Sequence, residues 1–136
     1  MIKYSICLPG IALLLFVASC KSPINPINLY GTWKYIKVEK PNASPQDTLT
    51  SAELASQRPT ILFKANDELS IDWGGKNLSH GKFDIDGNTI VYSENLPNGT
   101  IRTFPFWVSK LTDKEIVFET RGQDGSKVTA VRDGDH

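Results

Sequence analysis

The feature that most constrains this chain is a regular alternation of short apolar segments with turn-forming residues from Tyr30 onward. Asn, Asp and Gly recur in the turns, as in Asp86-Gly87-Asn88 and Pro97-Asn98-Gly99, and they tolerate the positive φ angles of tight hairpins. This spacing predicts a small all-β domain built from antiparallel hairpins. Eight strands are expected: Tyr30–Val38, Thr60–Ala65, Glu68–Trp73, Ser79–Ile85, Thr89–Glu94, Thr100–Leu111, Glu115–Arg121 and Lys127–Arg132.

Apolar and polar side chains alternate along these segments, so each strand has one inward face. In Glu68–Trp73, for example, Leu69, Ile71 and Trp73 fall on the same side. Eight antiparallel strands joined in sequence can avoid unpaired edges by closing on themselves. We therefore predict an eight-stranded antiparallel up-and-down barrel over residues 30–132, with a flattened two-sheet sandwich as the alternative.

The connection from Lys40 to Pro59 is much longer than the others. Thr50-Ser51-Ala52-Glu53 within it is a capping-box pattern, which predicts a short helix that continues through Gln57 before Pro59 stops it. A loop of this length in a compact domain is often functional. We expect either a lid over one barrel mouth, with Leu49, Leu54 and Ala55 facing inward, or a surface insertion.

The N-terminus has the organisation of a secretory leader. Lys3 supplies a positive charge, and the apolar stretch Ile11–Ala18 is too short to cross a bilayer as a helix. Val17-Ala18-Ser19-Cys20 resembles the lipobox of bacterial lipoproteins, which implies a signal peptide over residues 1–19 and lipidation of Cys20 with acyl chains such as palmitate. Residues 20–29 have the composition of a short tether. We therefore expect a lipid-anchored protein of the bacterial cell envelope, in the outer membrane and facing the periplasm.

Composition limits the remaining possibilities. The mature chain is long enough for one hydrophobic core, and residues 133–136 are expected to form a frayed tail. Loss of Lys3 with the leader leaves 14 Lys and Arg residues against 15 Asp and Glu residues. This balance predicts no nucleic-acid partner. The leader removes Cys7 and lipid consumes Cys20, so no disulfide is expected.

At the start of the first predicted strand, Gly31-Thr32-Trp33 resembles the Gly-x-Trp motif of lipocalins and of lipocalin-like domains in bacterial lipoproteins. The resemblance extends over Leu29 to Arg132. It implies that Trp33 packs across the closed end of the barrel with an arginine lying over it. In a closed meander the first and last strands pair antiparallel, which places Arg132 near Trp33 and favours it over Arg121 as the cation–π partner.

The predicted interior is rich in aromatic residues, which can either fill it or line an apolar pocket. Pro105 cannot donate a backbone hydrogen bond, so it predicts a bulge or a locally unpaired edge in its strand. His80 is a further polar candidate for contact with a ligand head group. We expect the mouth to present the ligand-binding candidates Trp73, Tyr92, Arg102, Phe104 and Phe106.

The sequence predicts a binding protein rather than an enzyme, with no cofactor and no metal. His80 and Asp84 share a strand face but lie four residues apart, about 13 Å along a strand, which is too far to share a metal ion. Asp47-Thr48-Leu49 resembles the O-glycan acceptor of exported proteins in Bacteroides-like bacteria, with Thr48 as the acceptor. The expected function is binding of a small apolar or amphipathic molecule without catalysis. The alternative is a solid-cored module that binds an envelope protein or glycan through an exposed aromatic patch around Trp107 or Tyr35.

Overall fold

The computed structural model describes residues 23–41, 47–121 and 125–134. The predicted leader, Cys20 and the last two residues lie outside these ranges. The elements within them are η2 (Pro26–Asn28), β1 (Gly31–Lys40), β2 (Asp47–Thr48), α2 (Ser51–Gln57), β3 (Thr60–Phe63), β4 (Glu68–Trp73), β5 (Lys76–Asp86), β6 (Thr89–Asn95), β7 (Ile101–Leu111), β8 (Glu115–Glu119) and β9 (Lys127–Arg132).

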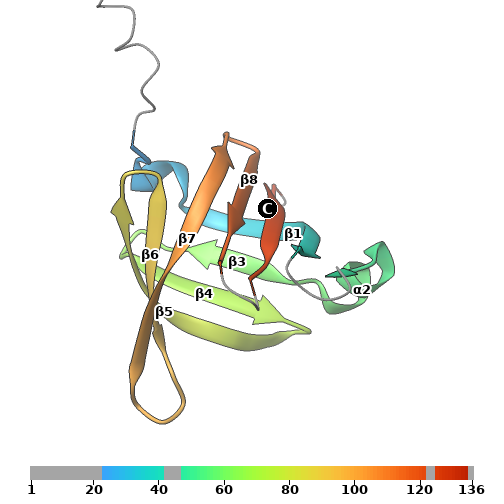
Figure 1. The fold of residues 1–136 in the computed structure, drawn as a ribbon, viewed down its shortest axis with the longest axis horizontal. Helices are drawn as coiled ribbons and strands as arrows, with labels where there is room; N and C mark the ends of the chain where they lie inside the picture. The colour runs from blue at the N-terminus through green and yellow to red at the C-terminus, as the bar shows by residue number, and fades with distance from the viewer. Residues whose placement is uncertain (1–22, 42–46, 122–124, 135–136) are drawn as a thin grey trace, which may run out of the picture.

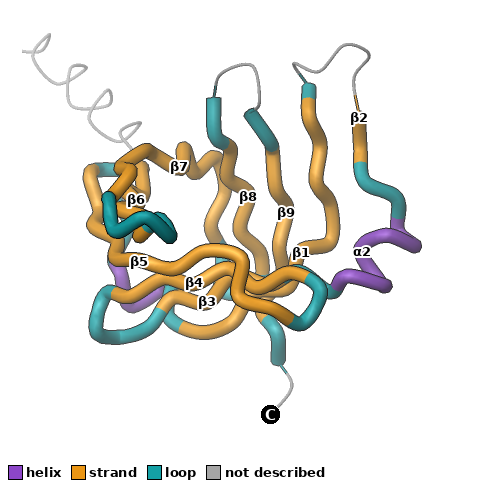
Figure 2. The backbone as a smooth tube through the Cα atoms, turned by 90° about the horizontal axis from the view of Figure 1, so that it is seen from below, coloured by secondary structure: helices purple, strands orange, loops and turns teal. Residues whose placement is uncertain are grey.

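These strands form a closed antiparallel barrel (Figures 1 and 2). Each strand from β3 to β8 pairs with the next one along the chain, and β1 pairs with both β3 and β9. The short β2 adds only two residue pairs at the end of β1, so the barrel itself has eight strands. The up-and-down barrel prediction is confirmed, and the sandwich alternative is wrong because the first and last strands meet.

Most element boundaries follow the sequence pattern. The bounds of β4 and β9 are those predicted, whereas β5 begins three residues before the expected Ser79. Helix α2 has both bonds of the capping box: the Glu53 backbone N–H donates to Thr50 Oγ1 over 3.1 Å, and the Thr50 N–H donates to Glu53 Oε1 over 2.9 Å. Leu54 is the buried residue of this helix.

One end of the barrel is closed around Trp33. Its side chain is fully buried, and its indole Nε1–H donates to the carbonyl of Leu29 over 2.8 Å. The Arg132 guanidinium carbon lies 4.1 Å from the Trp33 ring centroid, which confirms the predicted pairing. Arg121 instead lies over Trp107, also at 4.1 Å.

Gly31 is required by this arrangement. Its φ of +122° lies in a region that residues with a side chain rarely adopt, and a Cβ there would lie 2.9 Å from Arg132 Nη1. Arg132 also donates to the carbonyls of Tyr30, Asn28 and Asp113. The segment before β1 is therefore packed on the barrel, and Leu29, expected to belong to a tether, is fully buried in the core.

Of the two irregularities predicted at Pro105, a bulge or a locally unpaired edge, the structure has the unpaired edge. Pro105 stays in register with Val91 of β6, and the irregularity in β7 lies between Val108 and Lys110, so a bulge at Pro105 is wrong. The unpaired edge is confirmed. Within the described residues, the β8 ladder reaches β7 only as far as Trp107, so residues 101–106 pair with β6 alone.

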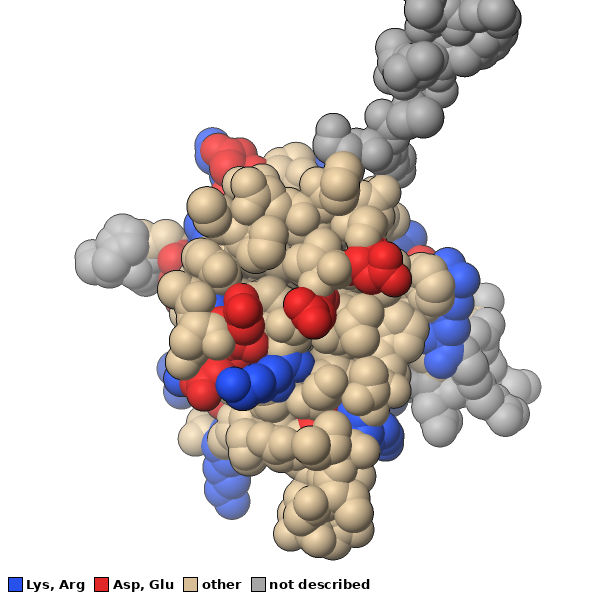
Figure 3. Space-filling model, turned by 90° about the vertical axis from the view of Figure 1, so that its left-hand side faces the viewer, with Lys and Arg blue, Asp and Glu red and all other residues tan. Residues whose placement is uncertain are grey.

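The surface carries both signs of charge. Figure 3 shows acidic and basic side chains scattered over one face, with uncharged residues between them. Side chains of opposite sign are paired on the surface, as in Lys110 with Glu115, where Nζ and Oε1 lie 2.6 Å apart.

Candidate functional site

The barrel holds a cavity of about 540 Å³ at the end opposite Trp33. This volume lies within the range of small-molecule binding sites. All of the predicted ligand-binding residues line it: Trp73, Tyr92, Arg102, Phe104 and Phe106. A second hollow of about 660 Å³ lies between the N-terminal segment and the β7–β8 turn, and none of its described lining residues is aromatic.

Aromatic rings form much of the cavity wall because the inward positions of neighbouring strands carry them. Tyr92 of β6 contacts Phe104 and Phe106 of β7, each with ring centroids 5.6 Å apart. Phe106 in turn packs on Phe118 of β8, with centroids 5.0 Å apart. These contacts form a continuous apolar surface across three strands.

Tyr35 is a cavity residue that sequence reasoning missed. The sequence suggested it for an exposed patch, but it is only 7% exposed and lines the cavity. Its ring packs edge-on against Trp73, with centroids 6.1 Å apart, and against Phe118 at 6.3 Å. Its position two residues after the buried Trp33 was the signal, because alternate residues of a strand share a face.

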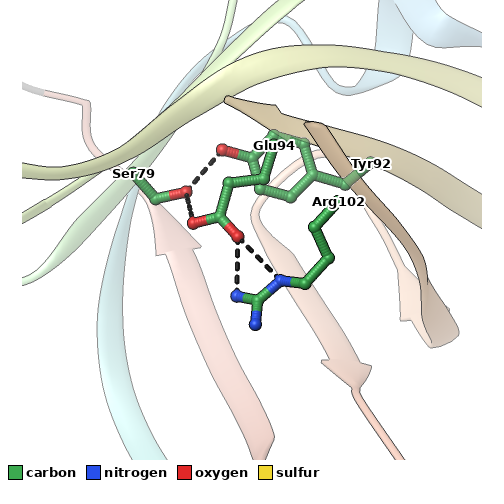
Figure 4. Close-up of polar contacts among 4 residues, drawn as sticks. All are labelled: Ser79, Tyr92, Glu94 and Arg102. Atoms are coloured by element: carbon green, nitrogen blue, oxygen red, sulfur yellow. Dashed lines mark hydrogen bonds and ion pairs between the residues drawn. The ribbon is translucent and has the colours of Figure 1, made fainter. Parts of the chain in front are cut away.

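A chain of polar groups crosses the rim of the cavity (Figure 4). Ser79 Oγ donates to Glu94 Oε2 over 2.7 Å, and the Tyr92 hydroxyl lies 2.6 Å from Ser79 Oγ. Because Ser79 uses its proton on Glu94, Tyr92 is the donor in the second bond. Arg102 donates to Glu94 Oε1 from Nη2 over 2.7 Å and from Nε over 3.2 Å. These hydrogen bonds link the buried phenol of Tyr92 to the charged side chain of Arg102 at the surface.

The side chains of this hydrogen-bonded series differ in solvent exposure. The Glu94 side chain is 13% exposed, whereas that of Arg102 is 62% exposed. The guanidinium carbon also lies 5.2 Å from the Phe104 ring centroid. Arg102 has five N–H donors and uses two of them on Glu94, so donors remain for a bound molecule.

Two tyrosines that line the cavity, Tyr35 and Tyr92, have raised pKa values. Burial raises the pKa of Tyr35, and the nearby Tyr92 raises it further. Burial also raises the pKa of Tyr92. Among the described residues, no buried side-chain nitrogen or oxygen atom lacks a hydrogen-bond partner.

In its described part, the long connection from Lys40 to Pro59 contributes to the cavity through two residues, at the end of β1 and just after β2. Lys40 and Leu49 line the cavity, but no residue of α2 does. Leu54 packs into the core, whereas Ala55 is exposed, so its predicted inward position is wrong. The connection is held to the barrel by the Gly74 backbone N–H, which donates to the Gln57 carbonyl over 2.7 Å. Thr48 is exposed, and its glycosylation stays a prediction.

His80 lies away from the cavity. It is exposed on the outer face, where its Nδ1 lies 3.2 Å from Asn77 Oδ1, and the expectation that it contacts a head group is wrong. Asp84 is exposed as well. Among the described residues, no group of three or more His, Cys, Asp and Glu side chains could hold a metal ion.

No helix in the described part of the chain is long and apolar enough to span a membrane. Compared with known protein families the sequence matches none, and no curated protein is significantly similar to it.

Proposed function

We propose that this chain is a lipid-anchored, lipocalin-like protein of the bacterial cell envelope that binds a small apolar or amphipathic molecule without changing it chemically. The observation that carries the proposal is the aromatic-lined cavity of about 540 Å³. Binding sites for small molecules are typically concave and mostly apolar, with a few polar groups that fix the orientation of the ligand.

The lining indicates how such a molecule would lie. Tyr35, Tyr92, Phe106 and Phe118 offer an apolar surface for its body. Arg102 at the rim offers free donors for a polar head group. Lys40, Arg102 and Glu94 are the charged residues of the described lining, which gives a balance of one positive charge. An amphipathic ligand with an anionic or acceptor-rich head group fits this arrangement.

The family and the location rest on sequence motifs together with the closed end. The lipobox ending at Cys20 supports the lipid anchor, and Gly31-x-Trp33 supports the lipocalin-like assignment. The stacking of Arg132 on Trp33, at 4.1 Å, is the arrangement that the resemblance implies. The alternative, a solid-cored interaction module, requires a filled interior, so the cavity favours ligand binding.

Two fluorescent probes with nearly the same aromatic body test the proposal: N-phenyl-1-naphthylamine, which is neutral, and 1-anilinonaphthalene-8-sulfonate. Each is titrated into the delipidated domain, and we expect saturable binding of both. Arg102→Gln should weaken binding of the sulfonate probe by roughly tenfold or more and leave the neutral probe unchanged, because a hydrogen bond to a charged group contributes about 1.5–3 kcal/mol.

Arg121→Gln is the matched control, since Arg121 also lies over an aromatic ring, that of Trp107 at 4.1 Å, but does not line the cavity. It should change neither affinity. Absence of saturable binding for both probes contradicts the ligand-binding function. Equal weakening of both probes by Arg102→Gln contradicts the role of Arg102 in contact with the head group.

A further inference from the structure

The N-terminal segment and the cavity lie at opposite ends of the barrel. The chain enters β1 at Gly31, at the same end as the β5–β6 and β7–β8 turns. The cavity is lined instead by residues near the other ends of the strands, such as Val38, Trp73 and Ser79. In Figure 1 the blue N-terminal segment accordingly lies at the far end of the barrel from the projecting β6–β7 hairpin.

The N-terminal segment is fixed to the closed end by specific bonds. The Ile24 backbone N–H donates to the Gly87 carbonyl over 2.9 Å, in the β5–β6 turn. Asn28 and Leu29 are held through their carbonyls, by Arg132 Nη2 and Trp33 Nε1. The point at which the described chain begins, Pro23, is therefore anchored beside the closed end.

The length of chain between this point and the proposed lipid anchor decides the orientation. Three peptide links join Cys20 to Pro23, and a fully extended chain spans at most about 3.6 Å per residue, so the reach is about 11 Å. Strand β7, at 11 residues, rises about 3.4 Å per residue. With the usual tilt of barrel strands it spans about 27 Å along the axis. The reach is thus too short to bring the mouth to the membrane surface.

We propose that the closed end of the barrel rests against the lipid bilayer that holds Cys20, and that the cavity mouth points away from this bilayer into the aqueous compartment. The inference rests on the lipid anchor of the proposed function. It follows that the ligand enters and leaves through water rather than directly from the anchoring membrane.

The exposed apolar residues of the barrel do not overrule this geometry. Leu78 and Ile101, at the mouth end, are 64% and 65% exposed, and Ile27, at the closed end, is 68% exposed. Because exposed apolar side chains occur at both ends, they do not favour one end over the other for contact with lipid. The mouth could reach the same membrane only if residues 23–30 detached, which would break the bonds of Ile24 and Leu29 and expose Leu29.

The chain offers a matched pair of positions for a test of this orientation. Asn66 lies in the β3–β4 turn at the closed end, and Asn98 lies in the β6–β7 turn at the mouth end. Both are exposed, and the side chain of each accepts a backbone N–H two residues later. Because the proposed processing leaves no other free cysteine, Asn66→Cys and Asn98→Cys each give one site for a fluorescent label.

The lipidated full-length protein, labelled at one site, is reconstituted into vesicles that carry a nitroxide quencher on the lipid head groups. We expect quenching of the label at position 66 to be severalfold stronger than at position 98. A flexible Gly/Ser insertion of about 20 residues between Ser22 and Pro23, with a mean reach of about 25 Å, should abolish most of this difference.

The outcomes separate the orientation from the anchor. Equal quenching at the two positions, or stronger quenching at 98, in protein that floats with the vesicles overturns the orientation alone. If the difference in quenching between positions 66 and 98 is unchanged by the long insertion, the short link from Cys20 to Pro23 does not cause the orientation. Failure of the protein to float with vesicles overturns the lipid anchor, and the orientation with it.

Discussion

Arg132 joins three separate segments at the closed end through one side chain. It stacks on Trp33 and donates hydrogen bonds to the carbonyls of Asn28, Tyr30 and Asp113. A lysine would keep the charge but could not reproduce the planar guanidinium with its several donors. Arg132 therefore has a structural role at the closed end, and it does not line the aromatic cavity.

We predict that Arg132→Lys lowers the free energy of unfolding by about 3 kcal/mol, because it removes charge-assisted hydrogen bonds as well as a cation–π contact. Urea denaturation measures the change. Arg121→Lys is the control, since Arg121 stacks on Trp107 at the same distance but is exposed. It should cost less than about 1 kcal/mol. Equal costs for the two substitutions would show that the bonds to the closed end add little.

Tyr35 and Tyr92 make stability depend on alkaline pH. Both phenols have a pKa raised above the ordinary value of 10.0 by burial. The unfolded chain therefore loses these protons first, and the stability they confer is present below pH 10 and is lost as pH rises above it. We expect the free energy of unfolding to fall above pH 10, by up to about 1.4 kcal/mol per pH unit for each tyrosine.

The comparison of Tyr35→Phe and Tyr92→Phe with the unchanged protein isolates this effect from other alkaline titrations. Each variant should show a shallower decline of stability between pH 10 and 12, measured by denaturation at fixed pH. If the free energy of unfolding falls as steeply with pH in both variants as in the unchanged protein, the two tyrosines do not cause the decline.

At the scale of the elements, the close pairing of β5 with β6 depends on Gly81. A Cβ at this position would clash with the Ser93 carbonyl oxygen, which is backbone and cannot rotate away. We predict that Gly81→Ala destabilises the domain by about 1–3 kcal/mol through forced displacement of β6. The exposed neighbour Lys82 serves as the control, and Lys82→Ala should stay within about 0.5 kcal/mol. Thermal unfolding of both variants provides the test, and a neutral Gly81→Ala would contradict this packing.

Local pattern was sufficient to predict most elements. Alternation and turn residues predicted β4 and β9, and the capping box predicted α2, because these signals act over a few neighbouring residues. The prediction that Tyr35 belongs to an exposed patch was wrong. Tyr35 lies two residues after the buried Trp33, so the alternation along the strand places it on the inward face. The β1–β9 register shift between Tyr35 and Lys37 then changes which later residues of β1 face the core.

Other features of the site depend on contacts between distant parts of the chain, which no local pattern encodes. The bonds of Arg132 to Tyr30 and Asn28 span more than 100 residues. The rim chain from Tyr92 to Arg102 needs the register of three strands to be correct at once. The sequence could therefore name the lining residues but not the volume that they leave between them.

The whole molecule is a barrel with two different ends. Pairing of β1 with β9, from Trp33 with Arg132 to Glu39 with Lys127, closes the sheet. At one end Trp33 and the N-terminal segment fill the interior. At the other end the described β8 ladder does not reach the first part of β7, residues 101–106. The cavity lies at this second end, where the aromatic wall is continuous but the strands are not all paired.

The central claim is that this cavity binds a ligand, and a crystal structure of the domain saturated with 1-anilinonaphthalene-8-sulfonate tests it most directly. The account predicts electron density for the probe between Tyr35, Tyr92 and Phe106, with the sulfonate directed toward Arg102. An interior filled by protein side chains, or a probe bound only to the outer surface, would contradict it.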